Sequence, residues 1–291
     1  MPELPEVETI VRGLRKKVLG RTFLDVWTDN PKTVKRPKTF DLFRKAIKGE
    51  RVKKIGRRGK NILIYLLGGK VLLIHQKMTG HLLYGLWRFE KRVWRPAERG
   101  PLEDPANRFI HLLFWLDNKK MLALSDLRKF AKVELWGSKE LEEDEDLKKI
   151  GPEPLARAFT YSKFKEVLKK RRGKIKQVLM DQEVLAGIGN IYSDEILWEA
   201  KVHPLAETSR LPETSLNRIY EAVSAVLKKA IAFRGDSMSD YRQVSGEKGR
   251  YQEIQRVYRQ EGKPCPRNDG GIIERLKIGG RSGHFCPVCQ K

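Results

Sequence analysis

Apolar and polar positions follow different periods in the two halves of the chain. Near the N-terminus the apolar residues recur at the i, i+3, i+4 spacing of one helix face: Val7, Ile10, Val11, Leu14 and Val18. This spacing predicts a helix over residues 2–19. Pro2 and Pro5 fall at or before its first turn, where a missing N–H is harmless.

Short apolar or alternating runs, separated by Gly, Asn and Asp turns, come next. They predict six strands, over residues 22–28, 61–67, 71–75, 109–116, 121–125 and 132–136. Six strands within about 115 residues are typical of a β-sandwich or a barrel-like sheet.

A charged stretch that ends in Pro and Gly divides the chain. Six of the seven residues from 140 to 146 are acidic, and Gly151 and Pro152 follow, a pattern typical of a linker. Beyond it the period becomes helical and predicts helices over residues 161–170, 174–186, 190–200 and 216–232. We therefore expect an α+β protein with four parts: a β-rich domain at 2–137, a linker at 138–155, a helical domain at 156–256 and a tail at 257–291 that holds two short strands.

The charge of the chain adds a class of partner. Among 291 residues there are 60 Lys+Arg and 37 Asp+Glu, a net charge of +23. Such a surplus favours a polyanion, nucleic acid first and an anionic membrane surface second. The apolar runs are far shorter than the ~20 residues of a membrane span. The acidic start lacks the order of a signal peptide, and the three cysteines all lie in the last 27 residues, which excludes a disulfide framework and favours the cytoplasm.

The N-terminus carries the first candidate chemistry. Pro2 follows Met1, and removal of Met1 would free a secondary amine. An α-amino group has a pKa of about 7.7–8, so a usable neutral fraction exists at physiological pH. Such an amine can attack a sugar C1′ and form a cationic iminium, with Glu3 and Glu6 suited to acid–base work. The alternative is an ordinary capped helix, with Pro early and Glu complementing the dipole.

Residues 1–10, Met-Pro-Glu-Leu-Pro-Glu-Val-Glu-Thr-Ile, resemble the opening of formamidopyrimidine-DNA glycosylases, and further motifs resemble this family in order along nearly the whole chain. These enzymes excise oxidised purines from DNA and nick the abasic strand. The resemblance implies an N-terminal helix with a β-sandwich, a helix–two-turns–helix domain and a zinc-finger-like β-hairpin. It also implies that Pro2 is the Schiff-base nucleophile, that Glu3 is the general acid and that Glu6 supports them.

A basic stretch ends at Lys60. Nine of the seventeen residues from 44 to 60 are basic, which by itself indicates a phosphate-contacting face or a merely solvated surface. The resemblance of Gly56-Arg57-Arg58-Gly59-Lys60 to the family implies that Lys60 contacts the phosphate beside the lesion and assists β-elimination.

Two further segments lie where strands end, and by themselves they predict only core or loop residues. Met78, Arg128 and Phe130 resemble the residues with which the family fills the gap left by a flipped base, and Arg128 would contact the orphaned cytosine. One departure is nearby. Phe109 stands where the family often has the first of two histidines and only His111 is retained, which leaves one phosphate contact of the family without its usual residue.

Residues 174–204 predict two helices joined by the tight turn Gly187-Ile188-Gly189, which can present amides and Asn190 to a phosphate. An ordinary helical hairpin is the alternative. The resemblance implies DNA contacts from Arg172, Lys176 and Asn190. The loop at 235–251, which ends at Tyr251, resembles the loop that closes over a flipped purine. With Leu4, it favours this branch over the endonuclease VIII branch.

The tail contains three cysteines where a zinc ribbon would have four. Asn268 stands at the place of the expected second cysteine. Zinc would then be held by Cys265, Cys286 and Cys289 with Asp269 as the fourth ligand, and His284 is the other candidate for that position. A metal-free hairpin remains open. Arg281 matches the finger arginine of the family, which grips the phosphates of the lesion and assists δ-elimination.

We therefore expect a bifunctional DNA glycosylase/AP lyase of base excision repair. It would act as a monomer on double-stranded DNA with an oxidised base or an abasic site, hold one structural zinc, and have no membrane partner. Two alternatives remain: an endonuclease VIII-like enzyme for oxidised pyrimidines, and a non-catalytic protein that binds damaged DNA.

Overall fold

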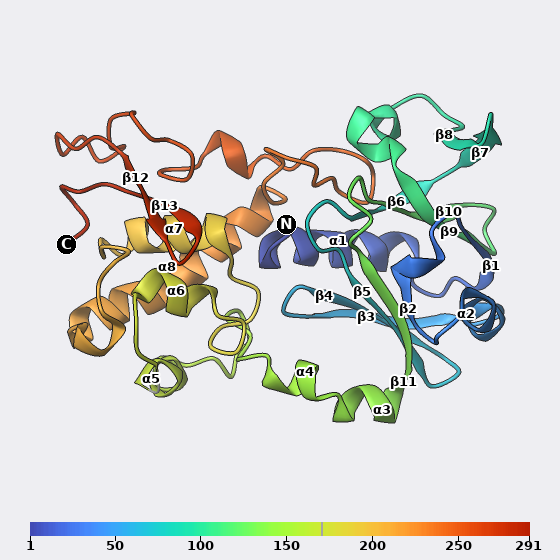
Figure 1. Cartoon of the computed structure of the whole chain (residues 1–291), viewed down its shortest axis with the longest axis horizontal. Coiled ribbons are helices and arrows are strands. Elements are labelled where there is room, and N and C mark those ends of the chain that lie inside the picture. Colours follow the sequence, from blue (N-terminus) through green and yellow to red (C-terminus); the bar gives the residue numbers. More distant parts are fainter. Residues whose placement is uncertain (170) are drawn as a thin grey trace. The chain divides into compact units, whose positions relative to one another are not determined.

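The computed structural model describes residues 1–169 and 171–291, which form two compact units (Figure 1). Unit 1 comprises Met1–Lys148 and Phe233–Gln252, and unit 2 comprises Lys149–Ala232 and Glu253–Lys291. The loop at 235–251, which we expected in the helical domain, therefore belongs entirely to unit 1. The predicted linker contains two short helices, α3 (Ser138–Glu143) and α4 (Glu145–Lys149).

The first helix, α1 (Leu4–Lys17), buries the apolar stripe that predicted it. Its N-cap is Glu3, which forms a capping box with Glu6, so the helix begins two residues later than the pattern alone suggested. On its exposed side Arg15 donates its Nε to the carbonyl of Ile55 (2.8 Å), which ties the helix to β3.

Unit 1 is built around two sheets, as the predicted sandwich requires (Figure 1). The four-stranded sheet has the order β1 (Phe23–Thr28), β9 (Ile110–Leu116), β10 (Met121–Ser125) and β6 (His81–Gly85). The five-stranded sheet has the order β2 (Val34–Arg36), β11 (Lys132–Gly137), β5 (Lys70–His75), β4 (Asn61–Leu66) and β3 (Val52–Arg58). Neighbouring strands are antiparallel except β11 and β2, which are parallel.

One continuous apolar core joins α1, both sheets and α2 (Phe40–Ile47). At its centre the rings of Phe23 and Phe114 lie 5.1 Å apart, and Phe43 contacts Phe114 edge-on. All six predicted strands are present. The sequence did not reveal β3, because its exposed positions are basic and its apolar period is broken. It also did not reveal β2, β6 or the small two-stranded sheet of β7 (Trp87–Glu90) and β8 (Val93–Pro96).

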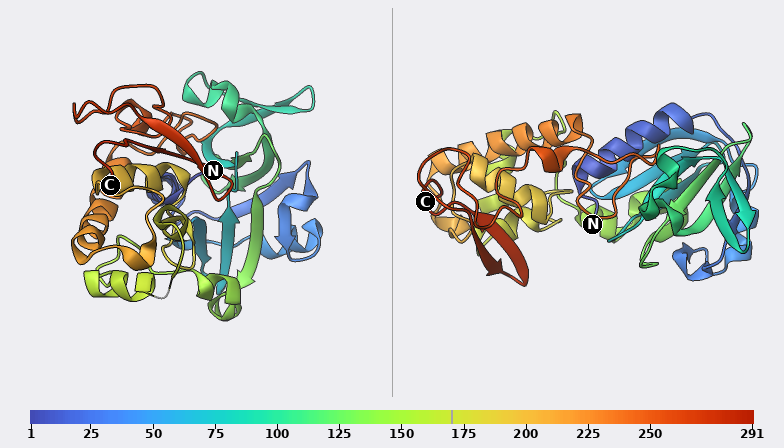
Figure 2. Two further views of the ribbon diagram at one scale, coloured as in Figure 1. Left: turned by 60° about the vertical axis from the view of Figure 1, so that its left-hand side comes forward. Right: turned by 90° about the horizontal axis from the view of Figure 1, so that it is seen from above.

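The described part of unit 2 combines helices with a β-hairpin (Figure 2). The helices are α5 (Tyr161–Lys169), α6 (Ile175–Met180), α7 (Asn190–Glu199) and α8 (Glu213–Ala232), and the hairpin is β12 (Glu274–Ile278) and β13 (Arg281–Phe285). Helix α6 is shorter than predicted. The apolar residues Val184, Leu185 and Ala186, which extended the predicted helix, are buried but lie in a turn. Lys170, the last residue of one predicted helix, lies outside the described residues.

Short 3₁₀ turns complete the structure: η1 (Pro31–Thr33), η2 (Pro101–Glu103), η3 (Pro105–Arg108), η4 (Thr208–Arg210) and η5 (Tyr251–Glu253). Among the described residues, no helix has both the length and the apolar character that crossing a bilayer requires.

Candidate active site and metal centre

The start of the chain is held by a pair of buried carboxyl groups. Glu3 and Glu6 are 3 % and 2 % exposed, and Glu6 Oε2 accepts the backbone N–H of Glu3 at 2.8 Å. Met1 is 42 % exposed and precedes Pro2, which is buried. Removal of Met1 would therefore uncover the amine of Pro2 beside two acidic side chains.

Glu6 also fixes the loop that follows α8. Its Oε1 accepts the N–H of Asp236 at 2.8 Å, and a Cβ at Gly235 (φ +80°) would lie 2.7 Å from the same oxygen. Burial, together with the charge of Glu6, raises the pKa of Tyr241 well above its ordinary value, so this phenol stays neutral and donates to the Arg234 carbonyl (3.2 Å). One carboxylate thus positions both the chain start and the loop.

Lys60 lies in the tight turn between β3 and β4, after Gly59 (φ +55°), and is 7 % exposed. The next residue, Asn61, pairs with His75 across the sheet. Burial, together with the charges of Lys77 and Lys60, lowers the pKa of His75 to about 4.

His75 is a residue that sequence reasoning missed. Its Nδ1 accepts the N–H of Lys77 at 3.0 Å, so the neutral ring carries its hydrogen on Nε2 and presents a donor next to Lys60. The only sequence signal was a polar residue at the end of an apolar strand, three residues before Met78.

The structure brings the segments of Met78, Arg128 and Phe130 together. Thr79 and Asp126 are hydrogen-bonded through their side chains, and the Arg128 N–H donates to Thr79 Oγ1 at 3.1 Å. The Arg128 guanidinium lies 4.7 Å from the centre of the Phe130 ring. Met78 and Phe130 are 38 % and 52 % exposed, as groups that enter DNA must be.

The surroundings of the missing family histidine are also defined. The Phe109 ring lies 4.8 Å from the Arg108 guanidinium, and His111 Nδ1 lies 2.9 Å from Asp29. His111 is therefore engaged by a carboxylate within the protein.

In unit 2 the turn before α7 is built around Gln182. Its amide donates to the carbonyls of Met180 (2.8 Å) and Ile188 (2.7 Å) and accepts the N–H of Gly187 (2.9 Å). This places Asn190 at the first position of α7, where its buried Oδ1 has no hydrogen-bond partner among the described residues. An amide at a helix N-terminus is the arrangement that we expected for a phosphate contact.

Lys176 is a correction. We expected a phosphate contact, but the side chain is fully buried, and its Nζ lies 2.5 Å from Asp194 Oδ1 and 3.0 Å from Ser193 Oγ. An ammonium with this ion pair and no exposed surface cannot reach DNA in this structure. It holds the first turn of α7 against α6 instead.

Asp194 extends this pair to the C-terminal hairpin. Its Oδ2 accepts the backbone N–H of His284 and lies 3.0 Å from His284 Nδ1, while His284 Nε2 lies 3.3 Å from Glu261. His284 is therefore held between two carboxylates, and it is not part of the metal-ligating group of the described residues. This excludes His284 as the fourth ligand.

Arg281 is exposed at the first position of β13, next to the turn Gly279-Gly280. Gly279 has a φ of +55°, and a Cβ there would lie 2.2 Å from the Gln177 amide nitrogen of α6. The positive φ favours glycine, and the contact of this turn with Gln177 places Arg281 close to α6.

Four side chains in the tail form the metal-ligating group: Cys265, Asp269, Cys286 and Cys289, whose ligand atoms all lie within 4.8 Å of one another. The Sγ atoms of Cys265 and Cys289 are 3.9 Å apart, and Cys286 Sγ lies 3.5 Å from Asp269 Oδ2. In a tetrahedral zinc site, bonds of about 2.3 Å to sulfur and 2.0 Å to oxygen give edges of about 3.8 and 3.5 Å. The residues present therefore fit zinc.

Asp269 is well suited to the fourth position. The Gly271 N–H donates to its Oδ1 at 2.9 Å and lowers the pKa of the carboxyl, so it is ionised as a metal ligand must be. A Cβ at Gly271 would lie 2.4 Å from Cys286 Sγ, so only glycine permits this close approach.

The two remaining predicted DNA contacts differ in exposure. Arg172 is exposed just before α6. Tyr251 is only 2 % exposed and donates its backbone N–H to the Gly235 carbonyl (3.0 Å), so its DNA contact stays a prediction.

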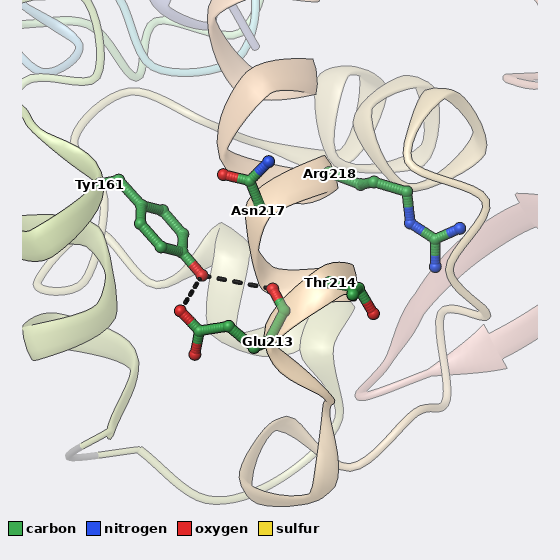
Figure 3. A pocket seen from close by; sticks show the side chains of 5 residues that line it. All are labelled: Tyr161, Glu213, Thr214, Asn217 and Arg218. Atoms are coloured by element: carbon green, nitrogen blue, oxygen red, sulfur yellow. Dashed lines mark hydrogen bonds between the residues drawn. The ribbon is translucent and has the colours of Figure 1, made fainter.

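A separate pocket of about 470 Å³ lies in unit 2 (Figure 3). There the Tyr161 hydroxyl lies within hydrogen-bond distance of the carboxylate (2.7 Å) and the carbonyl (3.3 Å) of Glu213. None of the residues that line it belongs to the predicted site, so it is not the candidate active site.

Comparisons with known proteins cover the chain from end to end. Family models match for the formamidopyrimidine-DNA glycosylase N-terminal domain (residues 1–133), the formamidopyrimidine-DNA glycosylase H2TH domain (150–242) and the zinc finger found in FPG and IleRS (262–291). Formamidopyrimidine-DNA glycosylases of Desulforamulus reducens and Heliobacterium modesticaldum are 39 % and 40 % identical to the chain, each alignment covering 100 % of it and 99 % or 100 % of the relative.

Solved structures of Lactococcus lactis Fpg are also similar. Its complex with abasic-site DNA has a TM-score of 0.85 at 34 % identity, covering 99 % of both chains. Its complex with Fapy-dG DNA has a TM-score of 0.84 at 34 % identity, covering 99 % of this chain and 100 % of that one.

Proposed function

The chain belongs to the formamidopyrimidine-DNA glycosylase family, and from this premise we propose that it excises oxidised purines from double-stranded DNA and cleaves the strand at the resulting abasic site. The observation that carries the proposal is the chain start, where a buried proline follows Met1 and precedes a capping box of two buried carboxyl groups. A helix cap alone needs no secondary amine next to it.

The first step uses Pro2 and Glu3. After loss of Met1, the neutral amine of Pro2 forms a bond to C1′ of the flipped nucleotide, and the bond from C1′ to the base nitrogen breaks. The base leaves with the electron pair and takes up a proton, and Glu3 serves as the general acid in this step. Opening of the sugar ring then gives an iminium between Pro2 and C1′. Glu6 holds the N–H of Glu3 and the loop at Asp236 in place during these steps.

Strand cleavage follows from the iminium, which acts as the electron sink. Loss of a C2′ proton expels the 3′ phosphate, and a second elimination expels the 5′ phosphate, so a one-nucleotide gap remains. Lys60, the neutral His75 beside it and Arg281 supply donors for these phosphates. Met78, Arg128 and Phe130 occupy the space that the flipped nucleotide leaves.

Zinc has a structural part in this scheme. Cys265, Asp269, Cys286 and Cys289 would hold it, and the bound ion would cross-link the two ends of the tail. The cross-link would keep β13, and with it Arg281, in a fixed conformation.

The partner we propose is DNA that contains an oxidised base or an abasic site, as in the Lactococcus lactis complexes. We propose a monomer that works in the cytoplasm. The three cysteines of the described chain are free thiols, which a reducing compartment preserves.

The test is borohydride trapping on a duplex with 8-oxoguanine opposite cytosine. We expect a covalent adduct on residue 2 with Met1 absent. Pro2→Gly is expected to lower excision and trapping by about 1,000-fold or more, because the nucleophile acts as one unit with its acid. Pro5→Ala, a buried proline three residues away, is the matched control and should trap normally.

Two outcomes would contradict the proposal. An adduct on another residue, or a Pro2→Gly variant that nicks as well as the native protein, would remove the catalytic assignment. A duplex with thymine glycol tests the alternative substrate class: faster excision from it than from 8-oxoguanine would indicate an endonuclease VIII-like enzyme.

A further inference from the structure

The β7–β8 hairpin is the part of unit 1 that the proposed function does not use. It lies at the end of unit 1 away from the N-terminus in Figures 1 and 2. An isolated two-stranded hairpin is marginal in water. Here Trp27 holds it through edge-on contacts to Trp94 (5.4 Å) and Phe89 (5.8 Å), and Trp94 contacts Trp115 (5.9 Å).

The register separates this aromatic face from a cationic one. Phe89 pairs with Trp94 on the aromatic face. Arg88 pairs directly with Arg95 on the opposite face, where both are exposed. Like charges directly opposite each other destabilise a strand pair, so this face is not arranged for the stability of the hairpin.

The turn of the hairpin is likewise not arranged for stability. Its two central residues, Lys91 (φ +49°) and Arg92 (φ +66°), have the positive φ angles of a type I′ turn. Asn-Gly is the favoured sequence there, and other residues cost roughly 1–2 kcal/mol each. Both side chains are exposed cations at the tip of the hairpin.

None of these four cations, nor the exposed Arg99 that follows the hairpin, is in an ion pair with a described residue. The segment from 87 to 100 contains five basic residues and two acidic ones, and one of the acidic residues, Glu98, is paired with Lys120 (3.3 Å). Glu90 shares the face of Arg88 and is the only remaining acidic residue of the segment, so the hairpin presents closely spaced, mostly positive charge that no ion pair with a described residue compensates. A row of phosphates at regular spacing would offset it.

We propose that the β7–β8 hairpin binds the phosphate backbone of the substrate duplex in its flank, outside the stretch that surrounds the lesion; this rests on the proposed function. Met78 lies three residues before β6, and the hairpin follows the other end of this strand. Five residues of strand span about 16 Å. For a duplex that runs along β6, this length corresponds to about five base pairs at ~3.4 Å each, so the proposal places the contact about five or more base pairs from the lesion.

The test compares two proteins of equal net charge with the native chain. Lys91→Asn with Arg92→Gly removes two cations and installs the favoured turn sequence, so its melting temperature should rise while its DNA affinity falls. Lys228→Gln with Lys229→Gln removes two exposed cations from α8 and is the control. The affinity of each protein is measured as a function of salt concentration for two duplexes that contain a central tetrahydrofuran abasic analogue. The long duplex has arms of about 12 base pairs on each side of the analogue, and the short duplex has arms of about 4.

On the long duplex, the slope of log K against log salt should be smaller in magnitude by about 2 for the hairpin variant than for the native protein. Two phosphate contacts are lost, and each contributes about 0.9 to the slope. Between about 50 and about 200 mM salt, its affinity then falls about tenfold less than that of the native protein. On the short duplex the two slopes should agree, and the control should match the native protein on both. Arg88→Gln with Arg95→Gln should repeat the result through the strand pair.

Equal slopes on the long duplex would overturn the inference. An equal change of slope on the short duplex would also overturn it, because the contact would then lie near the lesion. A change of slope seen only when one protein binds two duplexes would overturn it as well. Excision of 8-oxoguanine is assayed separately on the same proteins. Failure of the proposed function, which is absence of excision by the native chain, is therefore distinguishable from equal slopes.

Discussion

Unit 1 and unit 2 hold their site residues by different physical means. In unit 1, Lys60, Met78 and Arg128 lie in turns at the ends of strands whose other residues form one apolar core. In unit 2, Arg281 lies on a hairpin that is tied to the helices by the Lys176–Asp194–His284 contacts and to its own tail by the donors around Asp269.

These two means of support predict different responses to solution conditions and to substitutions. Apolar burial is non-directional, so the unit 1 turns should tolerate moderate changes in solution conditions. A buried charge network is directional, and loss of one partner leaves an uncompensated charge. We therefore expect Arg281 to be far more sensitive than Lys60 to metal loss and to single polar substitutions.

Removal of zinc should have the largest effect. Structural zinc contributes on the order of 10 kcal/mol to folding of its domain, so chelation or Asp269→Ala should unfold the tail and abolish Arg281-dependent cleavage. Hydrogen exchange should rise in 257–291 and stay unchanged in β4 and β5 of unit 1. Asp269→Cys is the matched control and should retain one zinc per chain. Purified protein without zinc but with full activity would contradict this prediction.

Substitution of Asp194 should have the next largest effect. Asp194→Asn leaves the buried Lys176 ammonium without its counter-charge and should destabilise unit 2 by about 3–5 kcal/mol. The measurement is hydrogen exchange in α6, α7 and β13 compared with the sheets of unit 1. Glu213→Gln breaks an exposed ion pair with Lys165 and should change the stability of unit 2 far less, because solvent screens exposed charges. Equal effects of the two substitutions would show that the buried network does not stabilise unit 2.

Lowering the pH should destabilise unit 1 through His75, and this is the smallest of the expected effects on stability. The pKa of His75 is lowered to about 4, against about 6.5 in an unfolded chain, so the unfolded state binds the proton first. Its contribution to stability is complete above about pH 6.5 and is lost as the pH falls toward 4, by about 2–3 kcal/mol at pH 4.5. Urea midpoints at pH 7 and 4.5 should therefore differ more for the native chain than for His75→Gln. Identical pH dependence would remove His75 as the cause.

Several features of the fold and the site followed from local pattern. The buried stripe of α1 and the six apolar strands were predicted because burial on one face imposes a period on the sequence. The zinc ligands, Asp269 included, followed from residue type and spacing, and the structure brings them together.

Other features depend on the surroundings of a residue. Val184 and Leu185 extended the predicted helix past Met180, but they are buried from a turn that Gln182 organises. The basic strand β3 was missed because its packing comes from α1 and β4 and not from its own apolar period.

The residue chemistry can be read from the sequence: an amine at Pro2, a surplus of cations and four metal donors. Which cations reach solvent depends on the packing of the folded chain. Lys176 and Arg281 are both basic residues in family motifs, yet one is fully buried against Asp194 and the other is exposed at a hairpin tip. The reason is that burial arises from segments far apart in the chain: Asp194 joins Lys176 to His284, which lies 90 residues further on.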